Sequence, residues 1–158
     1  MTPPINIRCA TAQDAEAISL LIRGSAHHFL LEPSGRGAEN FFDGITAQAI
    51  RTCITSANFH YLVAQSETEL AGAVALRDGK HLFHLFVAPA FQRQGLARAL
   101  WSAVKQAADP ALEAFTVNSS PNAVAVYERF GFSVVGPRRE ANGIVFVPMK
   151  SVANGSPA

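Results

Sequence analysis

The sequence predicts one α/β (α+β) domain with a mixed, largely antiparallel sheet of six to seven strands flanked by about four helices. Its 158 residues, 49% hydrophobic and 16% charged, suit a single domain with a substantial core. The predicted order of elements is β, α, α, β, β, β, α, β, α, β, β, which is not a strict βαβ repeat. We expect residues 1–150 to form this domain and residues 151–158, which are small and polar, to form a flexible C-terminal tail.

The N-terminal part begins with a strand and a helix. Residues 5–8 alternate apolar and polar side chains, and Thr11 with Asp14 then opens a segment of helical periodicity. Residues 24–44 are irregular, because prolines and glycines interrupt the periodicity, and loops of this kind often face ligands. Helical spacing resumes over residues 42–56, which predicts a second helix.

Three strands follow, over residues 59–65, 70–77 and 80–87. Asp78-Gly79 joins the second strand to the third and is typical of a type I′ hairpin turn. A helix then runs from Gly95 to the residues before Asp109-Pro110. The remaining predicted elements are a strand over residues 112–118, a helix over 121–130, and strands over 132–135 and 144–149.

Charge, cysteine spacing and hydropathy exclude several classes of protein. The formal net charge of +1 favours neither nucleic acid nor an anionic membrane as partner. Cys9 and Cys53 lie far apart without metal-ligand spacing, so we expect inert structural thiols and no metal. Because no secretory signal or membrane-spanning stretch is visible, we expect a cytoplasmic protein.

The strand over residues 80–87 leads through a loop with Gly95 into an amphipathic helix. The amide N–H groups and dipole at a helix N-terminus attract phosphate, and Arg93 and Arg98 would add positive charge. A tight strand-to-helix connection would use the same glycine without binding any ligand. The GxGxxG and Walker patterns are absent, which disfavours an ordinary dinucleotide or P-loop site.

Two motifs give the chain a family resemblance. Gln92-Arg93-Gln94-Gly95-Leu96-Ala97 fits the pattern Q/R-x-x-G-x-G/A, and residues 118–132 fit a second motif in which a tyrosine closes a helix ending in Gly-Phe. The chain therefore resembles the GCN5-related N-acetyltransferase (GNAT) family and its acyl-CoA N-acyltransferase fold. The resemblance covers most of the chain. Residues 25–57 carry no specific motif, although this region shapes the acceptor site in the family.

The resemblance implies that acetyl-CoA lies between the strands over residues 80–87 and 112–118. Its diphosphate would rest on the amides of residues 93–98, and a backbone N–H near Phe86 or Val87 would polarise the thioester carbonyl. The positions implied to bind the coenzyme are Leu85, Phe86, Val87, Gln92, Arg93, Gln94, Gly95, Leu96, Ala97, Arg98, Asn118 and Tyr127.

For catalysis, the resemblance implies that Tyr127 protonates the departing thiolate, although an ordinary half-buried helix aromatic is the alternative. His81 is the expected general base, because it lies six residues before Val87, where several relatives carry a base. Strand alternation would place His81 on one face with Phe83, Leu85 and Val87. His84, Glu32 and a chain of water molecules are alternatives.

Two further features have weaker signals. His27 and His28, followed by Phe29, could contribute to an acceptor pocket, although adjacent histidines at a helix end are more often capping or surface residues. Trp101 lies beside an apolar helix position and is expected to pack or to contact a second subunit.

The function we expect is acetyl-CoA-dependent N-acetyl transfer, directly to a primary amine of an unidentified acceptor such as a small molecule, a protein N-terminus or a lysine. One alternative is a non-catalytic acetyl-CoA-binding sensor with the same fold, and another is a nucleotide-binding regulator. The expected partners are acetyl-CoA and the amine, without nucleic acid, membrane or metal. A homodimer is compatible with the family.

Overall fold

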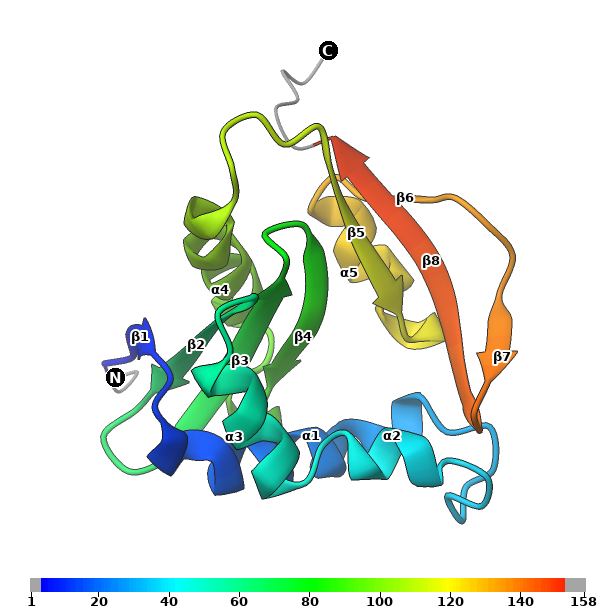
Figure 1. Cartoon of the computed structure of the whole chain (residues 1–158), viewed down its shortest axis with the longest axis horizontal. Helices are drawn as coiled ribbons and strands as arrows, with labels where there is room; N and C mark the ends of the chain where they lie inside the picture. Colours follow the sequence, from blue (N-terminus) through cyan, green and yellow to red (C-terminus); the bar gives the residue numbers. More distant parts are fainter. Residues whose placement is uncertain (1–3, 153–158) are drawn as a thin grey trace.

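The computed structural model describes residues 4–152, and its chain forms an eight-stranded sheet with helices on both faces (Figure 1). The strands follow the order β1-β2-β3-β4-β5-β8-β6, and β7 pairs with β8. The strands are β1 (Asn6–Cys9), β2 (Phe59–Gln65), β3 (Leu70–Arg77), β4 (His81–Val87), β5 (Ala114–Ser119), β6 (Ser133–Val134), β7 (Arg139–Ala141) and β8 (Ile144–Val152). Among the strands of residues 4–152, only β4 and β5 are parallel neighbours, which confirms the predicted mixed, largely antiparallel α/β fold.

The helices cover the two faces of the sheet separately. They are α1 (Ala15–Ser25), α2 (Glu39–Asp43), α3 (Ala47–Thr55), α4 (Leu96–Val104) and α5 (Val124–Arg129). Side chains of α4 and α5 join one core, in which Trp101 is only 2% exposed and packs on Phe115 and Phe132. Side chains of α1 and α3 build a second core on the opposite face.

Two hairpin turns have the left-handed backbone that a type I′ turn requires. Asp78 and Gly79, predicted to join β3 to β4, have φ angles of 54° and 69°. Asn142 and Gly143 have φ angles of 53° and 76° and join β7 to β8, although β7 was not predicted. The dipeptide Asn-Gly carries the same turn signal as Asp-Gly, so the sequence contained the information for this second hairpin.

The predicted helix over residues 42–56 is wrong as one element, because α2 ends at Asp43 and α3 begins at Ala47. Thr46 separates them, since its hydroxyl accepts a hydrogen bond from the Ala49 N–H at 3.1 Å and caps α3. The predicted tail is also too long, because Ser151 and Val152 pair with β5 as part of β8. Residues 153–158 lie outside the described residues.

The simple alternation expected for β4 is wrong because the strand carries a bulge. Leu76 pairs with Leu82 and Ala75 with His84, which leaves Phe83 as an extra residue in β4. Leu82 therefore joins Leu85 on the α4 face, while Phe83 joins the core on the opposite face. Because side chains alternate between the two faces of a sheet, one extra residue moves the side chains on one side of the bulge to the face opposite the one that simple alternation predicts.

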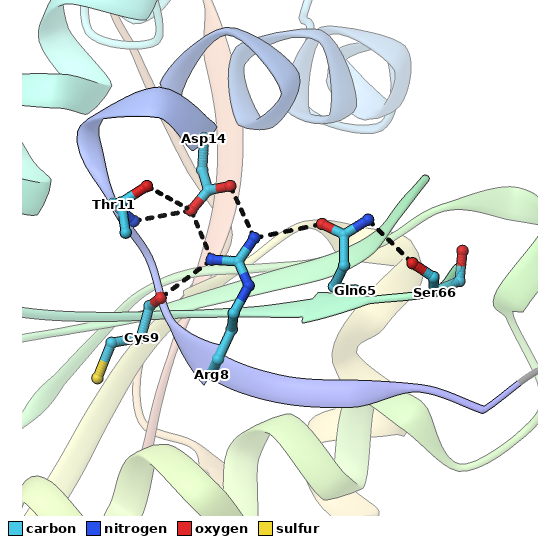
Figure 2. Close-up of polar contacts among 6 residues, drawn as sticks. All are labelled: Arg8, Cys9, Thr11, Asp14, Gln65 and Ser66. Atoms are coloured by element: carbon cyan, nitrogen blue, oxygen red, sulfur yellow. Dashed lines mark hydrogen bonds and ion pairs between the residues drawn. The ribbon is translucent and has the colours of Figure 1, made fainter. Parts of the chain in front are cut away.

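The junction between β1 and α1 is fixed by an ion pair (Figure 2). The Arg8 guanidinium donates to both carboxylate oxygens of Asp14 at 2.8 and 2.9 Å. The same carboxylate accepts the Thr11 N–H at 2.7 Å, and Arg8 also donates to Gln65 on β2 at 3.3 Å. These bonds lower the pKa of Asp14, chiefly through the hydrogen bond from Arg8.

Candidate active site

The candidate site lies where β4 and β5 move apart. They pair at His81 with Thr116 and at Leu82 with Val117, and no further pairs between them follow within residues 4–152. Figure 1 shows the two strands diverging beyond this point, with α5 beside β5. A cavity of about 670 Å³ opens there. It is lined by Ser25, His28, Phe29, Leu82, Phe83, Leu85, Phe86, Val87, Phe91, Gln92, Arg93, Gly95, Leu96, Ala97, Arg98, Val117, Asn118, Ser120, Asn122, Ala123, Val126, Tyr127, Arg129 and Phe130.

One end of the cavity meets the N-terminus of α4. Arg93 and Gly95 have φ angles of 64° and 80°, and the helix begins directly afterwards at Leu96. The amide N–H groups in the first turn of a helix have no hydrogen-bond acceptor within the helix. They are therefore available to bind an anion. A Cβ at position 95 would meet no atom within 4 Å. Glycine is therefore favoured here by the positive φ angle, and not by a close neighbour that would exclude a side chain.

Three arginines make this end of the cavity positive. Arg93, Arg98 and Arg129 line it. Arg98 also donates to the Arg129 carbonyl at 3.3 Å and lies over the Phe130 ring at 5.0 Å, which links α4 to α5. No aspartate or glutamate lines the cavity within the described part of the chain. The site therefore has the charge and backbone donors that suit a phosphate group.

The edge of β4 that faces the cavity is not paired with β5 beyond Leu82. After Leu82 the backbone groups on this side are not paired with β5, so they can bind an extended ligand as an additional strand would. Gln92 donates its amide to the Val87 carbonyl at 3.0 Å and closes the end of this edge. Asn118, on β5, lines the opposite wall.

Tyr127 is the titratable phenol within the cavity. It belongs to α5, is 8% exposed, and contacts the rings of Phe130 and Phe132. Gly131, with a φ angle of 98°, ends the helix, and the Phe132 N–H donates to the Tyr127 carbonyl at 3.0 Å. Burial raises the pKa of Tyr127, so the phenol keeps its proton at neutral pH.

The expected base, His81, does not line the cavity. Its Nδ1 is 2.8 Å from the hydroxyl of Thr116, the residue with which it pairs on β5, and burial lowers its pKa to about 4. His84 is also outside the lining, because its Nδ1 hydrogen-bonds the buried Tyr61 hydroxyl at 2.8 Å, and burial lowers its pKa to about 3. Glu32 does not line the cavity either. The geometry does not bring any of these three together with Tyr127.

The predicted coenzyme-binding positions converge on the cavity, since all of them except Gln94 line it. Gln94 instead donates its side-chain amide to the Ala90 carbonyl at 3.3 Å. His28 and Phe29, which lie in the turn after α1, line the cavity, whereas His27 does not. Sequence reasoning did not single out Ser120 or Arg129, although both lie within the second motif.

The described residues contain no group of three or more His, Cys, Asp and Glu side chains that could hold a metal ion. Within residues 4–152, every helix is too short or too polar to cross a membrane.

Comparison with known proteins decides the family. The model of the acetyltransferase (GNAT) domain matches residues 29–153, which is most of the chain. The chain belongs to the GNAT family. Membership supports acyl-CoA-dependent acetyl transfer as its general activity and acetyl-CoA as its co-substrate. The resemblance seen in the two sequence motifs is thereby confirmed.

Solved GNAT structures share this fold at low sequence identity. A GCN5-related N-acetyltransferase from Rhodopseudomonas palustris, named together with "Aminotransferase, Class-II", superposes with a TM-score of 0.76 at 17% identity, over 96% of this chain and 98% of that chain. The PaiA N-acetyltransferase from Thermoplasma acidophilum, solved with coenzyme A, has a TM-score of 0.73 at 16% identity, over 94% and 99%. The ribosomal-protein-S18-alanine N-acetyltransferase from Escherichia coli has a TM-score of 0.69 at 17% identity, over 98% and 99%. No curated protein matches the chain.

Proposed function

We propose that this protein transfers the acetyl group of acetyl-CoA directly to a primary amine while both substrates are bound. The observation that supports this most is the cavity between β4 and β5, which has free helix amides at one end and a protonated phenol inside. The amides of residues 93–98 and the three arginines would hold the diphosphate. The free edge of β4 near Phe86 and Val87, with Asn118 opposite, would hold the pantetheine arm.

In the reaction, the amine nitrogen attacks the thioester carbon, a C–N bond forms and the C–S bond breaks. A backbone N–H of the β4 edge would stabilise the negative charge on the carbonyl oxygen. Tyr127 would give its proton to the departing thiolate, and the phenol would regain one from water. The acetylated amine and the coenzyme A thiol are the products.

The amine must lose a proton before it attacks. His81 is poorly placed to accept this proton directly, because it does not line the cavity and its Nδ1 is hydrogen-bonded to Thr116. His28 is the imidazole that lines the cavity, at its exposed mouth. Desolvation and the neighbouring His27 lower the pKa of His28, so its ring is neutral at pH 7. We assign proton acceptance to His28, acting directly or through water.

Calorimetry with acetyl-CoA, followed by a thiol-release assay on a panel of primary amines, tests this function. We expect saturable acetyl-CoA binding and amine-dependent release of coenzyme A. Binding without release for any amine would favour the non-catalytic sensor, and absence of binding would refute the assignment.

Direct transfer requires no cysteine nucleophile. Cys9 is exposed, and burial raises the pKa of Cys53, which disfavours its thiolate. Neither cysteine lines the cavity. The double substitution of Cys9 and Cys53 by serine should therefore leave kcat within about twofold of the original value, since surface and half-buried changes away from a site act mainly on stability. A double variant that folds and has no activity would exclude direct transfer.

A further inference from the structure

The cavity crosses the sheet from one face to the other. Leu85, Leu96 and Tyr127 belong to or pack on the core on the α4 side, whereas Phe29, Phe83 and Phe86 belong to or pack on the core on the α1 side. In the proposed function, the helix amides would hold the diphosphate on the α4 side. The acceptor amine would then meet the thioester from the α1 side, which we call the acceptor end.

Phenyl rings form the walls of the acceptor end. Phe29 and Phe86 have ring centroids 5.9 Å apart, and Phe41 supports Phe29 from behind at 5.8 Å. The backbone of Phe29 is also fixed, because its carbonyl accepts the Val145 N–H at 2.8 Å. An apolar wall that is already ordered binds an apolar ligand without the entropy cost of arranging side chains.

The acceptor end has no group that would neutralise a second positive charge. Its polar lining residues are Ser25 and His28, and no carboxylate lines the cavity among residues 4–152. The Phe83 ring could attract a cation through its π electrons, but the Arg77 guanidinium already lies over it at 5.3 Å. A polyamine would thus bring an unpaired ammonium group into this aromatic end of the cavity, and leaving a charge unpaired there is costly.

We propose that the acceptor is a primary amine on a single apolar group, aromatic or branched aliphatic, with no second positive charge; this inference rests on the acetyl transfer proposed above. The phenyl walls receive the apolar group, and Ser25 and His28 receive the amine nitrogen. Diamines, polyamines and other polycations are poor acceptors.

Two amines of similar basicity test this inference: 2-phenylethylamine and 1,4-diaminobutane. We expect kcat/KM for thiol release from acetyl-CoA to be at least about tenfold higher for 2-phenylethylamine, a ratio within the range that apolar contacts supply. Equal values, or a preference for the diamine, would overturn the inference.

A binding measurement separates this inference from the proposed function. Calorimetric titration of each amine into the coenzyme A-saturated protein needs no turnover. If neither amine is acetylated but 2-phenylethylamine alone binds, the transfer reaction fails and the acceptor assignment stands. If 2-phenylethylamine does not bind, or the diamine binds as tightly, the acceptor assignment is overturned whether or not either amine is acetylated.

A matched pair of variants tests the role of charge. Ser25→Asp adds the missing carboxylate at the acceptor end, whereas Ser25→Asn has the same size without charge. We expect Ser25→Asp to reduce the preference for 2-phenylethylamine over 1,4-diaminobutane by about fivefold or more, since a charged pair in a partly desolvated site is worth about 1 kcal/mol or more. Ser25→Asn should keep the original ratio. An equal ratio in both variants would contradict the electrostatic argument.

Discussion

At the scale of single residues, Tyr127 differs from the other buried tyrosine in where it lies. The Tyr61 hydroxyl is bound to His84 within the α1-side core, whereas Tyr127 lines the cavity. Both have a pKa raised by burial, so both keep their protons at neutral pH. Position, rather than acidity, is therefore the reason for proposing Tyr127 as the proton donor.

Tyr127→Phe should lower kcat about a hundredfold, because general acid catalysis contributes factors of this order, and should change the Kd of acetyl-CoA little. Tyr61→Phe is the matched control, since it also removes one buried hydroxyl and should cost about 1 kcal/mol of stability without lowering kcat. Steady-state kinetics on both variants measures kcat, and calorimetry measures the Kd of acetyl-CoA. A Tyr127→Phe variant with the original kcat would remove the phenol from the mechanism.

The ionised Asp14 carboxylate should make the stability of the protein depend on pH. Its pKa in the folded protein is below the ordinary value of 3.8, so its stabilising effect is complete above about pH 4 and is lost as the pH falls through the folded-state pKa. Asp14→Asn should therefore lower the free energy of unfolding by about 1–2 kcal/mol at pH 7 and by much less near pH 2. Urea unfolding at both pH values measures this difference. The same loss at both values would show that the ionised carboxylate is not the cause.

At the scale of elements, the loop that precedes α4 is the segment that we propose binds the diphosphate of the coenzyme. Gly95 at the cavity and Gly79 in the β3–β4 turn form a natural comparison, because both have positive φ and a Cβ at either would meet no atom within 4 Å. A side chain at either position causes the same kind of backbone strain. Only Gly95 lies beside the amides that would hold the diphosphate.

Gly95→Glu should raise the Kd of acetyl-CoA about tenfold or more, because it places a negative charge at an anion site and strains the loop. Gly79→Glu carries the same added charge and similar strain and should leave the Kd unchanged. Calorimetry on the two variants compares them directly. Equal Kd values would place the diphosphate away from α4.

Several elements followed from local sequence signals, and others did not. The β2 and β3 strands and the Asp78-Gly79 turn depend on short-range patterns, so their predicted positions agree with the structure. The bulge at Phe83 depends on how β3 and β4 pair, and this pairing left no mark in the sequence of β4 alone. For this reason the alternation argument for His81 failed.

At the scale of the whole molecule, segments distant in sequence build the acceptor end together. The Leu31 N–H donates to the Gly143 carbonyl at 3.0 Å, and Leu30 forms an isolated bridge with Ile144, so the loop after α1 is attached to the β7–β8 hairpin. Gly37 lies against Gly143 so closely that a Cβ on Gly143 would be 2.4 Å from the Gly37 carbonyl carbon. Backbone atoms make these contacts, and many side chains are compatible with them, so this loop needs no specific motif to hold its place.

Gly143→Ala should displace this loop and raise the KM of the amine about tenfold, because a small misplacement of substrate-positioning groups is costly. The Kd of acetyl-CoA should stay the same, since the helix amides of α4 are not involved. Gly79→Ala is the control, because it adds a Cβ at a positive φ without a neighbouring atom. An unchanged amine KM in Gly143→Ala would mean that the hairpin does not position the acceptor.

We propose that the coenzyme lies across the sheet in the gap between β4 and β5, with its diphosphate on the amides that begin α4. A crystal structure of the protein with coenzyme A would show where the diphosphate and the thiol lie. It should show diphosphate oxygens within hydrogen-bonding distance of amide nitrogens among residues 93–98 and the thiol near the Tyr127 hydroxyl. A diphosphate bound elsewhere, or a thiol on the far side of the sheet from Tyr127, would contradict the account.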